Sequence, residues 1–353
     1  MATIRPFRAL RYDEGVAGPL EKLVAPPYDV ISDEKRDRLR GESPYNIVHL
    51  TLPDSDEEAA RALVGWRAAG VLVHEPEPAY WWLQQDYVGP DGVERRREGV
   101  VAALRVEPFE SRVVLPHERT HAGPKEGRLR LLRATRTELE PIFLLWDGTI
   151  ALDGLGDPEL EAEEGGVRSR LWRLGAAFGD ALTEELADAQ LLIADGHHRY
   201  ETALAFHDED GSEDSAWLLA VIVPTDQEGV MIFPTHRVAE SVNGVAGAPI
   251  GPPGDELPGP VLYRGGRYEL LAGDGLDPEV VERLAPQGVT YTPSAIDAVA
   301  AVDRGDAEAA FLLRPTRIED VWAVARRGDV MPQKSTFFYP KLTSGLLLLP
   351  LGS

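Results

Sequence analysis

The sequence contains no cysteine, which excludes disulfide bridges, thiolate metal sites and a cysteine nucleophile. It also lacks any apolar run near the roughly 18 residues that a membrane helix needs, and its first residues do not form the apolar core of a signal peptide. From these absences we expect a cytoplasmic protein with no membrane partner.

Positive charge is scarce as well. The chain has 36 basic and 59 acidic side chains among 353 residues, a net charge of −23. Such a surface repels a nucleic-acid backbone, so we expect no nucleic-acid partner. A small phosphorylated ligand in a locally basic pocket remains compatible with this balance. The length suffices for two domains, or for one large domain with an ample core.

The glycine-rich phosphate motifs G-x-x-x-x-G-K-[ST] and G-x-G-x-x-G are both missing. A different phosphate-binding pattern stands at residues 191–204. Four apolar residues, 191–194, predict a short buried strand, and Tyr200, Ala203 and Leu204 have helical spacing. The polar segment Asp195-Gly196-His197-His198-Arg199 lies between them. The pattern therefore predicts a strand, a tight turn and a helix.

The start of such a helix attracts anions, because its first N–H groups lack partners and the helix dipole adds positive charge. Gly196 removes a side chain that would keep a ligand away from this backbone. His197, His198 and Arg199 add basic groups, so we predict a phosphate site. Asp195 has a second interpretation as the helix N-cap, accepting from the N–H of His197 or His198, and this does not exclude another role.

A polar segment at residues 116–128 contains Glu118, and loops after strands commonly carry catalytic side chains. His117, Glu118 and His121 resemble loose metal ligands, but their spacing is not that of a zinc site and we do not predict one. Arg133 and Arg136 belong to a basic segment and are secondary phosphate candidates. The alternative for these two arginines is a solvated helical face.

The remaining pattern predicts a mixture of strands and helices. Ser55 and Glu58 form a capping box that begins a helix, and Gly265-Gly266 predicts a hairpin. Residues 241–260 are rich in glycine and proline and are the best linker candidate. We therefore predict a first region at 1–240 that carries the phosphate site, a linker or loop at 241–260, and a C-terminal α/β region at 261–353. Strands are expected at 46–50, 79–87, 99–106, 141–146, 167–174, 217–223 and 230–233.

Six stretches spread over the whole chain are together specific for one family. They are Pro26-Pro27-Tyr28-Asp29-Val30, Ser43-Pro44-Tyr45-Asn46, Pro116-His117-Glu118, residues 193–200, Pro234-Thr235-His236-Arg237 and Lys334-Ser335-Thr336. Their combination resembles the family called domain of unknown function 1015. The 195–200 turn also resembles that of ParB-like and sulfiredoxin-like proteins. The resemblance implies an α+β fold, a mixed sheet core with helices, elaborated by the C-terminal region.

Some members of that superfamily are free-serine kinases, which phosphorylate L-serine with a nucleotide and use a glutamate upstream of an Asp-Gly-x-His-Arg turn. Here Glu118 precedes residues 195–199 in the same order. The resemblance implies a kinase in which Glu118 accepts the serine hydroxyl proton. Asp195 and His198 would be the other catalytic residues, with Mg²⁺ held by phosphates and Asp195, and ATP or ADP as the donor.

The remaining site residues follow from the same resemblance. Thr235, His236 and Arg237 would hold the amino acid or its phosphate. Lys334 would serve phosphate oxygens, unless its segment is simply tied down by the three aromatic residues that follow. Two other functions stay open: a ParB-like nucleotide-binding switch without phosphoryl transfer, and a phosphohydrolase that uses water where the kinase uses serine.

Overall fold

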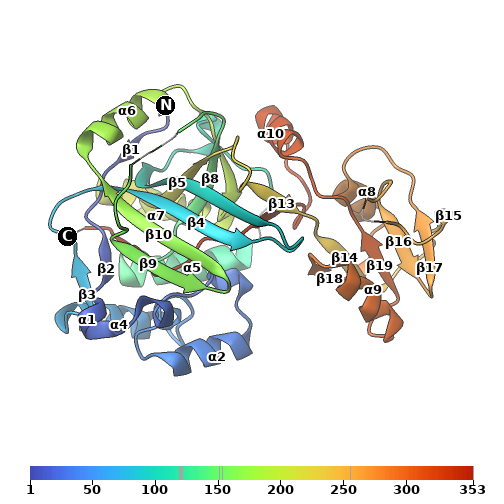
Figure 1. Cartoon of the computed structure of the whole chain (residues 1–353), viewed down its shortest axis with the longest axis horizontal. Helices are drawn as coiled ribbons and strands as arrows, with labels where there is room; N and C mark the ends of the chain where they lie inside the picture. The colour runs from blue at the N-terminus through green and yellow to red at the C-terminus, as the bar shows by residue number, and fades with distance from the viewer. Residues whose placement is uncertain (119–121, 151, 153, 255, 353) are drawn as a thin grey trace. The chain divides into compact units, whose positions relative to one another are not determined.

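The computed structural model describes residues 1–118, 122–150, 152, 154–254 and 256–352. The chain divides into two compact units. Unit 1 comprises residues 1–116, 120–230 and 340–353, and unit 2 comprises residues 117–119 and 231–339. Each unit combines a sheet with helices, so the predicted α+β fold class is confirmed (Figure 1). In the described part of the chain, no helix is long and apolar enough to cross a membrane.

Unit 1 is built on a mixed sheet, to which nine strands contribute within the described residues. Two neighbouring pairs, β6–β11 and β8–β12, are parallel, and the other pairs are antiparallel. Strand β1 (Ile4–Arg5) also belongs to this sheet: it pairs with β5 but lies outside the linear strand order. The order is β6 (Val114–Leu115), β11 (Leu191–Asp195), β8 (Ile142–Trp146), β12 (Trp217–Pro224), β5 (Glu94–Arg105), β4 (Tyr80–Val88), β10 (Val167–Leu174) and β9 (Leu160–Glu164).

Helices and shorter strand pairs complete unit 1. Its helices are α1 (Glu14–Ala17), α2 (Asp33–Glu42), α3 (Val48–Thr51), α4 (Asp56–Ala68), α5 (Ala122–Thr135), α6 (Ala176–Leu186) and α7 (His197–Asp210). Single 3₁₀ turns are η1 (Leu20–Lys22), η2 (Tyr28–Val30), η3 (Phe109–Ser111) and η4 (Asp214–Ala216). The short antiparallel pairs are β2 (Leu10–Tyr12) with β3 (Leu72–His74) and β7 (Thr137–Glu138) with β21 (Leu349–Pro350).

The core of unit 1 lies where alternate side chains of the central strands meet the helices. Trp82, Ile193 and Tyr200 are fully buried members of this cluster. The continuous apolar run of β12 is buried along its whole length, as expected for a strand covered on both faces. Burial on this scale, at about 25 cal/mol per Å² of apolar area, is the main favourable contribution to folding.

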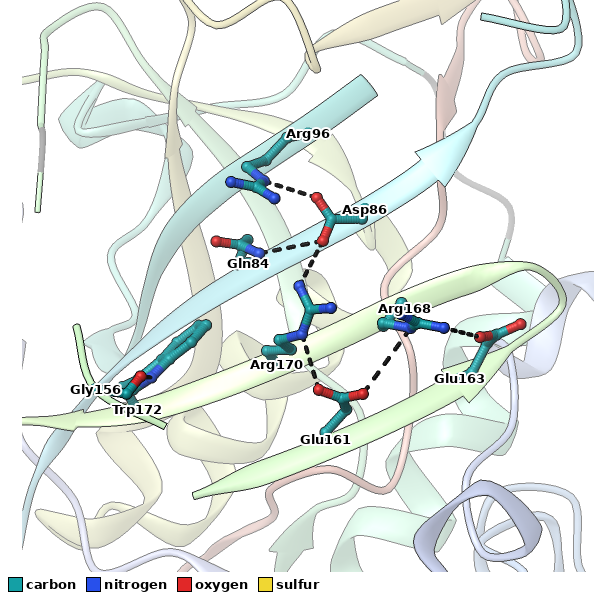
Figure 2. Close-up of polar contacts among 9 residues, drawn as sticks. All are labelled: Gln84, Asp86, Arg96, Gly156, Glu161, Glu163, Arg168, Arg170 and Trp172. Carbon is teal, nitrogen blue, oxygen red and sulfur yellow. Dashed lines mark hydrogen bonds and ion pairs between the residues drawn. The ribbon is translucent and has the colours of Figure 1, made fainter. Parts of the chain in front are cut away.

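The neighbouring strands β5, β4, β10 and β9 carry a ladder of ion pairs (Figure 2). Asp86 accepts hydrogen bonds from Arg96 at 2.7 Å and from Arg170 at 2.6 Å. Arg170 also donates to Glu161 at 2.8 Å, so its guanidinium joins β10 to both of its neighbours, β4 and β9. The predicted strand at 167–174 is present as β10, in which Arg168 is exposed and Arg170 and Arg173 are half-buried.

Unit 2 contains a second sheet, formed by six strands within the described residues in the order β15 (Ala248–Ile250), β17 (Arg267–Leu270), β16 (Val261–Arg264), β19 (Ala309–Leu312), β14 (His236–Ser241) and β18 (Gln287–Thr292). Apolar clusters cover both faces of this sheet. The predicted hairpin at Gly265-Gly266 is confirmed by the β16–β17 pair. The helices are α8 (Asp277–Arg283), α9 (Ala295–Asp303) and α10 (Ile318–Arg327), and β13 (Met231–Phe233) pairs with β20 (Phe337–Tyr339).

Two predictions about the secondary structure and the division of the chain are wrong. The expected strand at 46–50 contains the helix α3, because the Asn46 side chain accepts from the backbone N–H of Val48 at 3.0 Å and starts a helical turn. The division at 240/241 is also wrong. Strand β14 pairs with β18 and β19, the expected linker contributes β15 to the same sheet, and residues 340–353 belong to unit 1.

Candidate functional site

The predicted strand, turn and helix at 191–204 are present as β11, Gly196 and α7. Gly196 has a φ of +96°, which L side chains rarely adopt, and a Cβ there would lie 2.8 Å from Cγ2 of Ile142. Gly196 is itself the N-cap of α7, and no side chain caps the helix. The alternative role of Asp195 as the N-cap is therefore wrong. As the N-cap, Gly196 contributes no side chain over the beginning of α7, and the start of a helix suits an anion.

Asp195, at the end of β11, is held between two cations. Its Oδ2 accepts from Nη2 of Arg199 at 2.6 Å, and its Oδ1 accepts from Nζ of Lys341. Burial by itself would raise the pKa of Asp195, but the positive charges of Lys341 and Arg199 outweigh burial and hold the pKa well below its usual range. Asp195 is therefore ionised at neutral pH.

This arrangement does not fit a magnesium ion bound directly to Asp195, because both carboxylate oxygens already accept from cationic groups. Within the described residues, no group of three or more His, Asp or Glu side chains is placed to hold a metal ion. The prediction of Asp195 as a magnesium ligand is therefore wrong for this arrangement. His121, which the sequence associated with His117 and Glu118, lies outside the described residues.

Arg199 is buried, and the protein itself satisfies part of its guanidinium. Besides Asp195, it donates through Nη1 to the carbonyl of Pro141. Its pKa is raised: burial opposes the charge, but Asp195 and Glu140 favour it. Arg199 therefore supplies positive charge close to the turn and fixes the carboxylate of Asp195. His197 is buried and His198 is half-buried at the start of α7.

The sheet explains why Pro141 lies beside this turn. Strands β11 and β8 are antiparallel, and Asp195 pairs with Phe143. The end of β11 therefore lies next to the beginning of β8, and the residues just before β8 lie close to Gly196. Those residues include two buried glutamates, Glu138 and Glu140, which the sequence analysis did not select.

Glu140 joins the turn to the Pro-Pro-Tyr-Asp motif. Its Oε1 accepts from the backbone N–H of Tyr28 at 2.9 Å and from the Ser344 hydroxyl at 3.0 Å. Its Oε2 lies 3.6 Å from Nη1 of Arg128, whose guanidinium stacks 3.9 Å above the Tyr28 ring. Burial raises the pKa of Glu140, while Arg199 and Arg128 oppose this rise. Tyr28 of the motif at 26–30 thus stacks on Arg128, and its backbone N–H binds Glu140 beside the same arginine.

Glu138 differs from Glu140 because, within the described residues, it forms no ion pair with an arginine. It lines a small cavity of about 40 Å³ together with Arg128, Arg199 and Thr202. Its Oε1 is buried with no hydrogen-bond partner. Burial raises the pKa of Glu138 to about 8, so the side chain is mostly uncharged at neutral pH.

A further cation, Arg97 of β5, is buried in the same unit. Its Nη2 donates to the Pro340 carbonyl at 2.8 Å, and its guanidinium lies 4.4 Å from the Phe143 ring centre. Two other nitrogens, Nε and Nη1, are buried without partners. Burial lowers the pKa of Arg97 to about 10, and the charge of Asp195 opposes this change. Arg97 therefore stays charged at neutral pH.

The segment 340–344 connects these groups. Pro340 accepts from Arg97, Lys341 donates to Asp195, and Ser344 donates to Glu140. Neither Lys341 nor Arg97 was predicted. A basic residue near the C-terminus, and an arginine just before the apolar run of β5, were the available signals.

Unit 2 brings together three of the motifs singled out in the sequence. Oε1 of Glu118 accepts from the backbone N–H groups of Ser335 and Thr336, each at 3.1 Å, and from the Thr336 hydroxyl at 3.0 Å. His117 is buried and shares the Thr336 hydroxyl at 2.9 Å. In the described part of the chain, Oε2 of Glu118 has no partner. The segment 334–336 therefore fixes one oxygen of Glu118 and leaves the other available.

The third motif, residues 234–237, contributes a buried cation to the same unit. Burial lowers the pKa of Arg237, while nearby negative charge, including that of Glu118, opposes the change. Its Nη1 and the Thr235 hydroxyl are buried without partners. His236 has a structural contact, since its Nδ1 accepts from the backbone N–H of Leu313 at 3.1 Å. Lys334 is exposed and has a φ of +56°.

Two predicted phosphate ligands lie elsewhere. Arg133 donates to Glu209 at 2.7 Å, and Arg136 donates to Asp210 at 2.7 Å. Both acceptors are at the C-terminal end of α7, about 20 Å from its beginning at 1.5 Å per residue. Both side chains are partly exposed and paired with acids, but only Arg133 lies within α5, because Arg136 follows the end of that helix. Their role as secondary phosphate ligands stays a prediction.

Comparison with known proteins agrees with the motif pattern. The family described as protein of unknown function DUF1015 matches residues 4–249, well over half of the chain. The chain belongs to the DUF1015 family. No curated protein matches the sequence.

Several solved structures are similar to this DUF1015 protein. A variant of a free serine kinase in complex with AMP is 16% identical, with a TM-score of 0.43 over 70% of this chain and 92% of that chain. SbnI from Staphylococcus aureus, truncated at its C-terminus, is 13% identical, with a TM-score of 0.44 over 71% and 87%. A conserved hypothetical protein from Pyrococcus furiosus is 16% identical, with a TM-score of 0.38 over 70% and 95%.

Proposed function

We propose that this protein is a small-molecule kinase that binds ATP or ADP at the beginning of α7 and transfers a phosphoryl group to the hydroxyl of free L-serine. The observation that carries the proposal is an excess of positive charge, part of it buried, beside the glycine N-cap of α7. Arg199 and Lys341 donate to Asp195, and Arg128 lies 3.6 Å from Glu140. A fourth cation, Arg97, is buried with no ion pair in the described part of the chain, and Glu138 is mostly uncharged.

This local excess of positive charge contrasts with the negative net charge of the whole chain. The whole chain has a net charge of −23, so most of its surface opposes an anion. A buried cation without a counterion is costly, and a bound polyphosphate would relieve that cost. The first N–H groups of α7 and the side chain of His198 would bind phosphate oxygens, and Gly196 would allow their close approach. Asp195 would act indirectly, by orienting Arg199 and Lys341.

A kinase also needs a group near the acceptor hydroxyl. We propose Glu118 for this role, since Oε1 is fixed by three donors and Oε2 is available to accept a proton. Arg237, with a buried unpartnered nitrogen, would bind the carboxylate or the product phosphate of the amino acid. Thr235 would donate its hydroxyl to the same ligand. Serine as the acceptor rests on the resemblance of the motif order, with Glu118 preceding the Asp195 turn.

The test is to incubate the full chain with ATP or ADP, magnesium and a panel of amino acids, and to follow the products by phosphorus NMR. If the protein is a serine kinase, a phosphoserine resonance should grow as the nucleotide is consumed. Growth of inorganic phosphate without serine dependence would indicate a phosphohydrolase. Nucleotide binding in calorimetry without turnover would indicate a switch. If neither nucleotide binds, the proposal is wrong.

A further inference from the structure

Unit 2 contains a cavity of about 1100 Å³. None of the residues 195–199, which form the proposed phosphate site, lines it. One wall is a single face of α9, because Ile296, Val299, Ala300 and Asp303 follow the i, i+3, i+4, i+7 spacing of neighbours on a helix. The cavity is as large as the biggest typical small-molecule sites and far exceeds what a molecule the size of serine would fill.

Much of the lining is apolar. Leu276, Val299 and Leu312 contribute aliphatic surface, and Tyr268 contributes an aromatic ring. Ile296 is 81% exposed, an unusual position for a large aliphatic side chain that also borders a cavity. An apolar ligand body would cover this surface and gain free energy from its removal from water.

The charged groups of the lining leave an excess of negative charge. Both arginines already have acidic partners, since Arg314 donates to Asp277 at 2.6 Å and Arg317 lies 3.3 Å from Glu319. By contrast, two lining carboxylates, Glu256 and Asp320, have no ion-pair partner in the described part of the chain.

Asp303 adds a further negative charge at the last residue of α9. Its carboxylate accepts from the Tyr263 hydroxyl at 2.5 Å, which neutralises no charge. The Tyr263 and Tyr268 rings lie 4.7 Å apart, so an aromatic face and a carboxylate meet near the end of the helix. A helix C-terminus, a carboxylate and an aromatic ring each favour a cation. His236, which also lines the cavity, adds no positive charge, because burial lowers its pKa to about 4.

We propose that this cavity binds a small amphipathic cation, with its apolar body against the Ile296 face of α9 and its positive group beside Asp303. The ligand class follows from the match between an apolar wall and an acidic end. This binding activity is separate from the proposed phosphoryl transfer, and neither requires the other.

The test compares three ligands that share one apolar tail and differ in charge. The full chain is titrated in a calorimeter with octylammonium, octanoate and octanol. Octylammonium is expected to bind about tenfold or more tightly than octanoate, a difference of about 1.4 kcal/mol, with octanol between them. Equal or tighter binding of octanoate would show that the charge argument is wrong. Absence of octylammonium binding below millimolar concentration would show that the cavity is not such a site.

Two variants locate the ligand. Ile296→Lys places a positive charge in the cavity at an exposed position, and Asp303→Asn removes a negative charge while keeping an acceptor for Tyr263. Each is expected to weaken octylammonium binding by about tenfold. The matched controls are Val64→Lys, at an exposed position of α4 in unit 1, and Asp306→Asn, where the carboxylate pairs with Arg304 outside the cavity lining. Equal affinities in all four variants would place the ligand elsewhere and overturn the proposal.

Discussion

Lys341 and Asp195 are 146 positions apart in the sequence, yet Nζ of Lys341 donates a hydrogen bond to Oδ1 of Asp195. The contact attaches the C-terminal segment of unit 1 to the beginning of the helix that we assign to phosphate binding. It holds one carboxylate in its charged form and adds a half-buried cation beside a backbone that attracts anions.

Replacing Lys341 by methionine should lower the free energy of unfolding by about 2 kcal/mol at pH 7, because a buried carboxylate loses one of two charged partners. The folded-state pKa of Asp195 is depressed, so this stabilisation is present above the unfolded pKa of about 4 and is lost as the pH falls further. Urea unfolding at several pH values measures it. The control, Lys35→Met, removes a more exposed pair with Glu164 and should cost under about 1 kcal/mol. Equal losses for both variants would contradict a special role for Lys341.

Gly196→Ala should destabilise the protein more than Gly211→Ala does. Both glycines have positive φ, but a Cβ at Gly196 would press against Ile142, whereas nothing lies within 4 Å of one at Gly211. We expect about 1 kcal/mol for Gly211 from backbone strain alone, and clearly more for Gly196. Chemical denaturation gives both values. If the two losses match, the close approach at Gly196 has no energetic consequence.

His198→Ala should weaken ADP and ATP binding by about 1–3 kcal/mol if its ring donates to a phosphate. Arg133→Ala is the matched control, since Arg133 is basic but pairs with Glu209 at the other end of α7. Isothermal titration calorimetry on both variants decides the matter. A larger effect from Arg133 than from His198 would move the phosphate site away from the turn.

Glu118→Gln should lower turnover by about a hundredfold or more, because the amide cannot accept the hydroxyl proton. The amide oxygen can still accept from Ser335 and Thr336, so the melting temperature and the nucleotide affinity should change little. Phosphoserine formation and thermal unfolding are the two measurements. A variant that makes phosphoserine at nearly the wild-type rate would show that the base is another residue.

Glu138 should make stability depend on pH. Its folded-state pKa is raised from 4.5 to about 8, so the folded state binds more protons than the unfolded state between these values. Stability therefore falls as the pH rises through this window, by up to about 1.4 kcal/mol per pH unit. Glu138→Gln should remove this slope, while Glu57→Gln, at an exposed position of α4, should keep it. Parallel stability curves for the wild type and Glu138→Gln, measured by urea unfolding from pH 5 to 8, would contradict the assignment.

Local patterns in the sequence determined the elements on which the site is mounted. Residues 191–204 were correctly predicted as strand, turn and helix, because an apolar run and helical spacing are properties of neighbouring residues. The helix start at Ser55 was also correct, since the Ser55 side chain accepts from the backbone N–H of Glu58 as an N-cap. The prediction failed at residues 46–50, where the Asn46 side chain starts a helix that apolar content alone does not reveal.

Tertiary structure alone decided which charged groups meet. Lys341, Arg97, Glu138 and Glu140 come from three distant segments, and only strand pairing and the return of the C-terminal segment bring them to Asp195 or its neighbours. The same reason explains why Arg133 and Arg136, basic and close in sequence to a polar loop, pair with acids at the far end of α7. The sequence determined which residues can carry charge. Burial and long-range contacts decided which of these charges are ionised, paired or left without a partner, because desolvation and Coulomb energies depend on the folded surroundings.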